Sequence, residues 1–491
     1  MDVIENWRAA PLTARRDIIT SLVAATSSHP AVDPLTLVRA PEHWGVYASL
    51  GPNFQYAVFG RDSIETAEDI LDTHPELVHE MLLMLCRLQG TGYGEQSEEE
   101  PGKIHHEYRA RFLDGLEIPE GSQLIMHNLQ QIWGGAGTDE MVYYGAHDST
   151  PLFVRLLDRY CLVYGADILN ESTPQHNSDQ LSTVRRCAEA ALAWLETKIS
   201  DDTSGLFAYR RLSQNGIVNQ AWKDSPTSYL HTDGSLPDPN AAVASIELQG
   251  YAYDALRAGI RMELGSADDR NRWDKTAKHI QHQTVHLLWM DEAEYFAQGI
   301  DFTNPAAPRI IATITSNPAV LLDSELLHDL PTSEAERYIQ PITRMVLSDQ
   351  LLTSVGVRCR STYNWPLLDF VDYHGPNTVW PKETYDIAKG FRRAGLHQLA
   401  DDLEQRLLYG LQEAGEFSEF FYVSRNGNVW YDPEEALQHF GAQSPGHTLP
   451  VPEPAQAWTI AAAIRILHER KVRGRKPTTQ TQTDSVLEPV A

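Results

Sequence analysis

Residues 396–413 read LHQLADDLEQRLLYGLQE, and their apolar positions fall three or four residues apart. Leu396, Leu399 and Leu403 therefore share one helix face, while acidic and basic residues take the other. The same period recurs along the chain and predicts about a dozen helices. We expect them at Leu12–Thr26, Ser63–Asp72, Pro75–Gln89, Thr150–Tyr164, Leu181–Ile199, Asn240–Glu263, Asn271–Trp289, Thr332–Ser348, Lys382–Arg393, Leu396–Glu413 and Pro454–His468, with a short one at Pro318–Leu327.

Long polar and aromatic stretches separate these helices, at Thr91–Tyr144, Asp201–Pro239, Val355–Pro381 and Glu416–Pro452. Loops of this length are uncommon in compact domains and usually carry function. Helical hairpins with long loops at one end are typical of an all-α (α/α) toroid, and Val/Ile-rich alternating runs are absent from the sequence. We expect one domain over residues 1–470. Residues 471–491, which have little to bury, are expected to form a disordered tail.

The net charge of the chain limits which classes of molecule it can bind. The chain has 491 residues, 67 of them acidic and 40 basic, with a formal net charge of −27. Such a chain should repel DNA, RNA and anionic membranes, so a neutral partner such as a sugar fits better. It has no apolar run of the ~18 residues needed to span a bilayer and no signal pattern at its start. Its four cysteines form no CxxC pair, which favours buried thiols in a reducing compartment and predicts a cytoplasmic protein.

Motifs for metals and cofactors are missing. The sequence contains no HExxH, P-loop or GxGxxG string. His105, His106 and Glu107 are adjacent, but no second cluster is spaced to complete a metal site. We therefore interpret these three residues as active-site rim or structural residues and expect no metal and no cofactor.

Carboxylates, arginines and tryptophans gather in short strings on the expected loops. In chain order these are GRDS at 60–63, EEPGKIHHEYR at 99–109, YYGAHDSTPLF at 143–153, QAWKDS at 220–225, IELQGY at 246–251 and VWP at 379–381. In this order they resemble the amylo-α-1,6-glucosidase family, bacterial proteins related to glycogen debranching enzymes. The resemblance extends from about Tyr56 to Trp458. It implies an (α/α)6 barrel whose end cavity cleaves α-1,6 branch linkages of glycogen or related α-glucans and releases glucose.

Glycoside hydrolysis needs one carboxylic acid to protonate the leaving oxygen and a second carboxylate to activate water or attack the anomeric carbon. The resemblance places the acid at Asp224 in the WKD string. The same Asp, followed by Ser-Pro, could instead cap a loop or a helix.

The second carboxylate has more than one candidate. Related debranching enzymes carry a Glu in a string before the last helix, and FSEFFYV at 417–423 makes that residue Glu419. Glu453, in PVPEPAQAW, is its rival, and Glu416 is a weaker one. Relatives with this barrel generally invert, so we expect inversion.

The resemblance also implies a set of substrate-binding residues. Arg61 and Asp62 of GRDS would hold the terminal glucose, because vicinal hydroxyls offer paired donors and acceptors. They could instead form a local ion pair near a helix start. Trp222, Trp380 and Trp458 would stack on sugar faces, although aromatic residues of large helical proteins more often belong to the core. The set is completed by Asp148, Lys223, Glu247, Glu383 and Glu453.

Two departures from the family pattern keep other functions open. Ser418 replaces a proline beside Glu419, and Lys382 and Glu383 stand where relatives more often have His-Asp. The alternatives are a hydrolase of another small α-glucoside, trehalose-like or glucosylglycerate-like, and a carbohydrate-binding protein without catalysis. The sequence does not give the oligomeric state.

Overall fold

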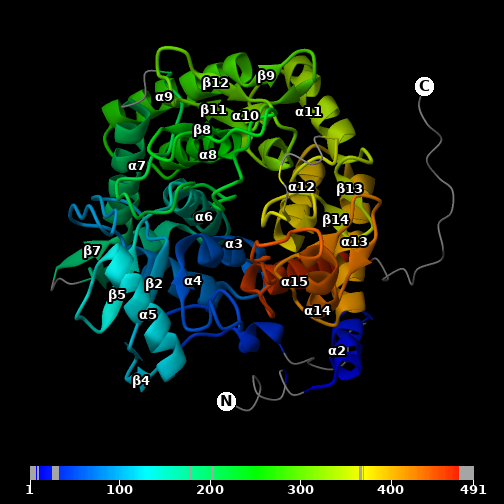
Figure 1. Cartoon of the computed structure of the whole chain (residues 1–491). Coiled ribbons are helices and arrows are strands. Elements are labelled where there is room, and N and C mark those ends of the chain that lie inside the picture. Colours follow the sequence, from blue (N-terminus) through cyan, green and yellow to red (C-terminus); the bar gives the residue numbers. More distant parts are fainter. Residues whose placement is uncertain are drawn as a thin grey trace.

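The computed structural model describes residues 7, 10–24, 33–176, 180–200, 204–363, 368 and 370–474, and helices dominate it (Figure 1). The α-helices are α2 (Leu12–Ala24), α3 (Gly60–Ile70), α4 (Pro75–Arg87), α5 (Glu120–Trp133), α6 (Ser149–Tyr164), α7 (Val184–Ser200), α8 (Ile246–Arg261), α9 (Ala267–Leu287), α10 (Glu325–His328), α11 (Thr332–Val346), α12 (Pro381–Arg393), α13 (His397–Ala414), α14 (Pro433–Gly441) and α15 (Ala457–Val472). Three 3-10 helices join them, η1 (Pro34–Leu37), η2 (Ala166–Asn170) and η3 (Asn317–Leu322).

The inner helices close a ring. Helix α3 packs on α6, α6 on α8, α8 on η3, η3 on α12 and α12 on α15, which returns to α3. A second layer surrounds this ring: α4 packs on α3, α7 on α6 and α8, α9 on α8, α11 on η3, and α13 on α12 (Figure 1). The expected all-α toroid is confirmed.

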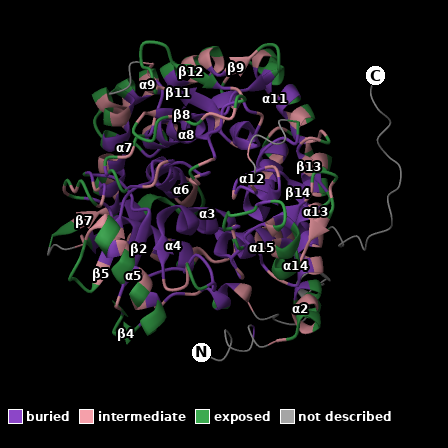
Figure 2. Ribbon diagram, viewed as in Figure 1, coloured by how far each residue is buried: buried purple, intermediate pink, exposed green. Residues whose placement is uncertain are grey.

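Inner helices are buried on nearly every side, because the outer layer covers one face and the end loops cover much of the other (Figure 2). All 11 residues of α3 are buried, among them the polar residues Asp62, Ser63, Glu65, Thr66, Glu68 and Asp69. A buried carboxylate is tolerated only when it is paired and hydrogen-bonded. The neighbouring inner helices must therefore supply the opposite charges.

Helices α6 and α12 supply these charges. Lys382 Nζ of α12 lies 3.2 Å from Glu65, and Lys389 Nζ of the same helix lies 2.8 Å from Asp69. Arg155 of α6 donates to both oxygens of Glu68, at 2.9 and 2.7 Å. Because removing one partner leaves an uncompensated buried charge, these pairs fix how α6 and α12 sit against α3.

Short antiparallel sheets fix the loops at one end of the ring. The three-stranded sheets, given in the order of their pairing, are β1 (Val58–Phe59), β2 (Glu107–Ala110) and β5 (Glu140–Tyr143); β12 (Arg309–Ile311), β11 (Gly299–Asp301) and β8 (Val243–Ser245); and β15 (Thr378–Val379), β16 (Phe421–Val423) and β17 (Val429–Trp430). The two-stranded pairs are β3 (Phe112–Leu113) with β4 (Leu116–Glu117), β6 (Ser172–Pro174) with β7 (Leu181–Thr183), β9 (Trp289–Met290) with β10 (Tyr295–Phe296), and β13 (Leu352–Thr353) with β14 (Gly356–Val357). Pairing of Phe59 with Glu107 and of Val379 with Phe421 brings distant loop segments together.

The structure differs from the expected elements in a few places. Helix α5 lies inside the stretch 91–144, and α14 lies inside 416–452, both expected to be loops. The helix expected from Asn240 begins at Ile246, because 243–245 form strand β8. The inward face of α5 carries buried Met126 and half-buried Ile125, Leu129 and Trp133, an apolar helical spacing that the sequence analysis did not use.

The C-terminal helix ends close to the expected end of the domain. Helix α15 continues to Val472, past the expected domain end at 470. Residues 475–491 of the expected tail, and residues 25–26 of the first expected helix, lie outside the described residues. Among the described helices, none combines the length and the apolar character that crossing a bilayer requires. All four cysteines are free thiols.

The buried pairs of α3 give a stability prediction. Arg155→Met removes the guanidinium that binds Glu68 and keeps an apolar side chain of similar length. We expect the free energy of unfolding in urea to fall by up to about 3–5 kcal/mol, because Glu68 then keeps only Arg159 as a partner and buried Asp254 loses its contact with Arg155. Arg272→Met is the matched control, since Arg272 is 54% exposed in its pair with Glu196, and it should change stability by about 1 kcal/mol or less. Equal effects of the two substitutions would contradict this account.

Candidate active site

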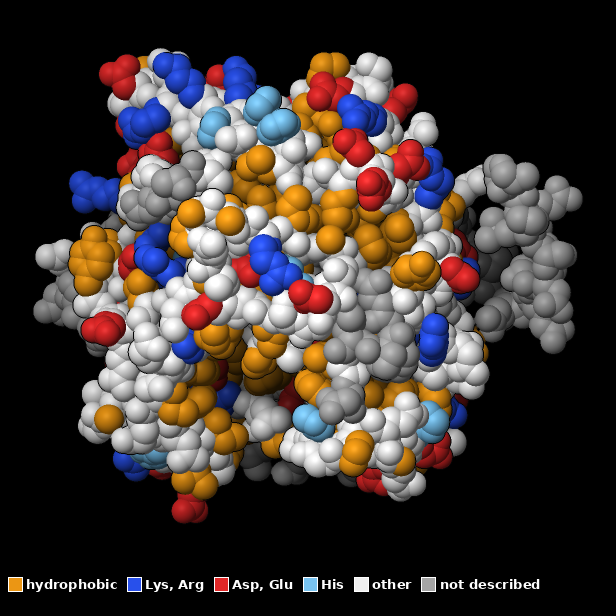
Figure 3. Space-filling model, turned by 45° about the horizontal axis from the view of Figure 1, so that its top comes forward, with side chains coloured by type: hydrophobic (Ala, Val, Ile, Leu, Met, Phe, Trp, Pro, Cys, Tyr) orange, Lys and Arg blue, Asp and Glu red, His pale blue; other side chains and the backbone are white. Residues whose placement is uncertain are grey.

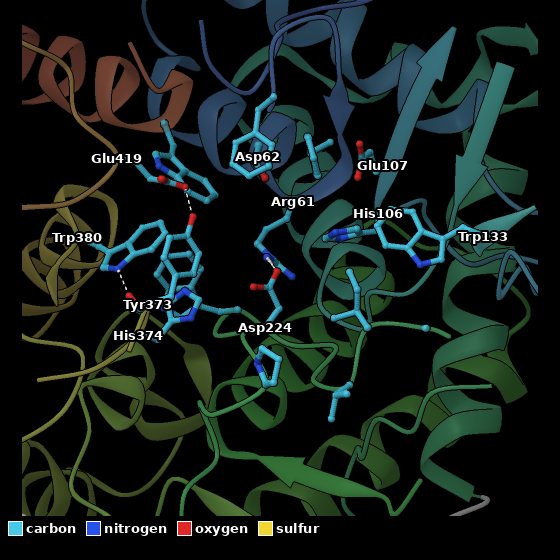
Figure 4. A pocket seen from close by; sticks show the side chains of 18 residues that line it. Arg61, Asp62, His106, Glu107, Trp133, Asp224, Tyr373, His374, Trp380 and Glu419 are labelled. Carbon is cyan, nitrogen blue, oxygen red and sulfur yellow. Dashed lines mark hydrogen bonds and ion pairs between the residues drawn. The ribbon is translucent and has the colours of Figure 1, made fainter. Parts of the chain in front are cut away.

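A cavity of about 410 Å³ lies among the end loops (Figure 4). Seven of the residues singled out in the sequence line it: Arg61, Asp62, Trp222, Asp224, Trp380, Glu419 and Trp458. The remaining lining residues are Phe54, Phe59, His106, Glu107, Trp133, Gly216, Ile217, Val218, Pro226, Tyr373 and His374. Residues from nearly the whole length of the chain therefore meet in one space, as the closed ring requires.

The first turn of α3 anchors the cavity. Gly60 lies against the segment just before β2, where an added Cβ would stand 2.1 Å from the His105 carbonyl oxygen. Only glycine fits there, so the next residue, Arg61, enters the cavity from the helix start. Arg61 donates from Nε to Asp148 Oδ2 at 2.6 Å and from Nη1 to Asp224 Oδ2 at 3.1 Å. This one guanidinium therefore joins a fully buried carboxylate to a cavity carboxylate.

The cavity holds several carboxyl groups and little positive charge. Burial raises the pKa of Asp224, and Arg61 opposes that shift. Burial also raises the pKa of Asp62 to about 7, again against the effect of Arg61. Gln456 Nε2 donates to Asp62 Oδ1 at 3.2 Å. Groups whose protonation is adjusted by burial and by a charged neighbour are typical of sites that transfer protons.

Glu419 accepts a donor at each of its two oxygens. The Tyr373 hydroxyl donates to Oε1 at 2.5 Å, and the Glu453 backbone N–H donates to Oε2 at 3.1 Å. Burial raises the pKa of Glu419 to about 8, although the hydrogen bonds from Tyr373 and Glu453 lower it. Burial therefore raises the pKa of both Asp224 and Glu419, and at each of them a hydrogen bond to the ionised form opposes the shift.

Glu453, the rival of Glu419, lies behind it and is not among the lining residues. Its carboxylate accepts from Ser49 Oγ at 2.8 Å and from Asn53 Nδ2 at 2.9 Å. Its backbone also accepts from the Glu419 N–H at 3.0 Å. Glu453 therefore holds the Glu419 segment in place. Glu416 is bound by Arg15 instead.

Aromatic rings form one side of the cavity. Trp222 meets Trp380 and Trp458 edge to face, with ring centroids 5.1 and 5.6 Å apart. His374 stacks on Trp380 at 5.0 Å. Lys382 Nζ lies 4.6 Å from the Trp222 ring centroid, a cation–π contact from inside the ring of helices. Lys382, which pairs with Glu65 inside the ring of helices, therefore also contacts a residue that lines the cavity.

Four other residues expected to bind substrate lie outside the lining of the cavity. Lys223 Nζ lies 2.9 Å from Glu383 Oε1, and Glu383 accepts from Trp222 Nε1 at 3.3 Å. Asp148 holds Arg61, as described. Glu247 accepts from Tyr229 at 2.7 Å and from Asn317 at 3.0 Å. The structure buries all four completely, and none of them lines the cavity.

Several lining residues were not singled out from the sequence as site residues. Glu107 and His106, which the sequence indicated as active-site rim or structural residues, line the cavity. Tyr373 and His374 precede VWP by a few residues and could have been suggested only by their place in that loop. Nothing in the sequence marks Trp133, which ends the unexpected helix α5. Within the described part of the chain, no group of three or more His, Cys, Asp or Glu residues could hold a metal ion.

The comparisons with known proteins concern the fold. No family model matches the chain, and no curated protein matches its sequence. Among solved structures, a GH63 mannosylglycerate hydrolase from Thermus thermophilus in complex with glucose has a TM-score of 0.54 and 14% identity, over 93% of this chain and 100% of that chain. The chain shares its fold with glycosidases. A wild-type glycosidase has a TM-score of 0.55 and 11% identity, over 94% and 98% of the two chains.

The two donors on Glu419 give a prediction about protonation. Difference infrared spectroscopy should detect a carboxyl group that titrates near pH 8 and that disappears in Glu419→Gln. In Tyr373→Phe this titration should move to higher pH, because the hydrogen bond from Tyr373 stabilises the ionised form. Tyr93→Phe, at a position 85% exposed, is the control and should leave it in place. An unchanged titration in Tyr373→Phe would show that Tyr373 does not affect Glu419.

Proposed function

We propose that this protein is a glycoside hydrolase that releases glucose from α-glucosides, with α-1,6 branch-type linkages of glycogen or related oligosaccharides as its substrates. The observation that carries the proposal is one aromatic cavity containing both Asp224 and Glu419. The glycosidase fold and the order of motifs along the chain support it.

In the proposed reaction, Asp224 donates a proton to the glycosidic oxygen while the bond from that oxygen to the anomeric carbon breaks. Glu419 takes a proton from a water molecule, whose oxygen attacks the anomeric carbon. The products are glucose and the leaving group with a restored hydroxyl. Atoms and charge balance, and the two carboxyl groups return to their starting states after one proton exchange with solvent.

The environments of the two groups suit these roles in different ways. The Asp224 side chain is 25% exposed, so it can meet an oxygen in the cavity. Glu419 lies deeper, and the donors at both of its oxygens favour its ionised form. The reaction needs protonated Asp224 together with ionised Glu419. Burial raises the pKa of Asp224, which favours the protonated form, and the hydrogen bonds to Glu419 oppose the effect of burial on the base.

Arg61 and Asp62 would hold the terminal glucose through its hydroxyls, and Trp222, Trp380 and Trp458 would pack against its C–H faces. A sugar is neutral, which suits a chain of net charge −27.

A second candidate is a small α-glucoside in which glucose is joined to glycerate. The mannosylglycerate hydrolase among the solved structures favours it, because that protein covers nearly the whole chain. A carbohydrate-binding protein without catalysis is a third reading. The three candidates are distinguished by measuring the free glucose released from panose, isomaltose, limit dextrin, trehalose and glucosylglycerate.

The catalytic assignment is tested by substitution. Asp224→Asn and Glu419→Gln keep the shapes of the side chains but remove the proton donor and the base. Each should lower kcat for glucose release by about 100-fold or more with little change in melting temperature. Glu434→Gln, at an exposed position, is the control and should behave as the wild type. Activity within a few-fold of wild type in Asp224→Asn would remove Asp224 from its role.

The stereochemistry of the product is a separate test. If Glu419 activates water, the glucose first released from an α-glucoside is the β-anomer. Proton NMR during the first minutes of reaction should show the signal of the β-anomer before mutarotation equilibrates the two anomers. An initial α-anomer would instead indicate a covalent intermediate on the enzyme.

A further inference from the structure

The cavity has a second side, opposite the one that carries Glu419. Figure 4 shows Glu419, Tyr373, Trp380 and His374 on one side, Trp133, His106 and Glu107 on the other, and Arg61 with Asp224 between them. We call the second side the α5 wall, after helix α5. It consists of Trp133, His106, Glu107, Ile217 and Val218.

Trp133 is held firmly at the cavity. Its ring stacks on Tyr143 with centroids 4.1 Å apart and an angle of 8°, and its Nε1 donates to the Asn215 carbonyl at 3.3 Å. The Tyr143 hydroxyl donates to Glu98 at 3.3 Å and accepts from the Ile217 N–H at 2.8 Å. One face of the Trp133 ring is therefore covered by Tyr143, and the half-buried indole still lines the cavity. This is the arrangement of a stacking platform for a flat or ring-shaped ligand.

The proposed chemistry decides which part of a substrate meets this wall. Water activated by Glu419 attacks the anomeric carbon from the side of Glu419, so the leaving group departs from the opposite side. Asp224 must reach the oxygen between the two parts of the substrate. The leaving group therefore lies beyond Asp224, against the α5 wall.

The charges of the cavity limit what the leaving group can be. Among the described lining residues, the only Lys or Arg is Arg61, and its guanidinium already donates to Asp148, Asp224 and the Ala221 carbonyl. Glu107 of the α5 wall is bound by Arg109, which does not line the cavity. Burial, with Arg61 nearby, lowers the pKa of His106 far below its ordinary value, so its ring is neutral at pH 7. An anionic leaving group would meet a carboxylate there and no free cation.

Resting on the function proposed above, we propose that the α5 wall is a leaving-group subsite for a neutral sugar ring. Trp133 stacks on that ring. Glu107, fixed by Arg109, accepts its hydroxyls and disfavours an anionic leaving group such as glycerate. The neutral His106 ring completes this wall, with its Nδ1 buried and without a hydrogen-bond partner among the described residues. The substrate class is therefore glucose linked to another neutral sugar.

The test compares two substrates that differ only in the leaving group. α-Glucosyl fluoride keeps the glucose part but offers no ring to the α5 wall, whereas isomaltose fills both parts. Trp133→Ala should lower kcat/KM for isomaltose by about tenfold or more and change that for α-glucosyl fluoride by less than about twofold. Trp133→Phe, which keeps an aromatic ring, should recover most of the loss. Leu124→Ala, on the same helix at a position 61% exposed, should leave both values unchanged.

A second measurement tests whether the α5 wall disfavours an anionic leaving group. The wild type should cleave isomaltose or panose with higher kcat/KM than glucosylglycerate, and Glu107→Gln should narrow that difference. If Trp133→Ala and Trp133→Phe each lose as much kcat/KM on α-glucosyl fluoride as on isomaltose, Trp133 is a structural residue and the proposal is overturned. A preference for glucosylglycerate would also overturn it while leaving the hydrolase function intact. Failure to cleave any of these substrates, α-glucosyl fluoride included, would instead remove the hydrolase function itself and the subsite with it.

Discussion

The pairing of the α3 carboxylates with bases from α6 and α12 is the constraint on which the rest of the structure depends. A helix that is buried along its whole length and carries Glu65, Glu68 and Asp69 can exist only inside a ring that neutralises it. The same helix starts with Arg61 and Asp62, so the position of the candidate site follows from the position of these pairs. Lys382 joins the two regions, since it pairs with Glu65 and lies against the ring of Trp222.

The polar residues around the cavity divide into those that line it and those that hold the lining in place. Asp148, Glu383 and Glu453 bind the lining residues Arg61, Trp222 and Glu419, and Lys223 holds Glu383. Each fixes the orientation of a side chain that must be in place before a ligand arrives, and pre-organisation of this kind supports precise chemistry.

The molecular surface differs from the cavity. Figure 3 shows acidic and basic side chains mixed toward the edges of one face, and hydrophobic ones gathered nearer its middle.

Sequence reasoning predicted most of the helices because their burial follows a period of three and four residues, as in α13. It missed α5 because polar Ser122 and Gln130 are buried beside Met126 while apolar Leu124 and Ile132 are exposed, which blurs the apolar spacing of Ile125, Met126 and Leu129. The strands are two to four residues long, too short to alternate visibly. Asp224 and Glu419 were selected through the family resemblance, since their proximity depends on ring closure. Tyr373 and Trp133 carry no local signal at all.

Ring closure also has a consequence for how the chain folds. Helix α15 packs against both α3 and α12, and the contact of Gln456 with Asp62 spans 394 positions of sequence. During synthesis from the N-terminus, α3 must therefore wait for almost the entire chain to be made before its last neighbour arrives. Contacts of such long range make folding slow and leave incomplete chains with exposed surface that invites aggregation. Closure of the ring therefore has to wait until α15 has been synthesised, and until then α3 lacks the neighbour that covers it.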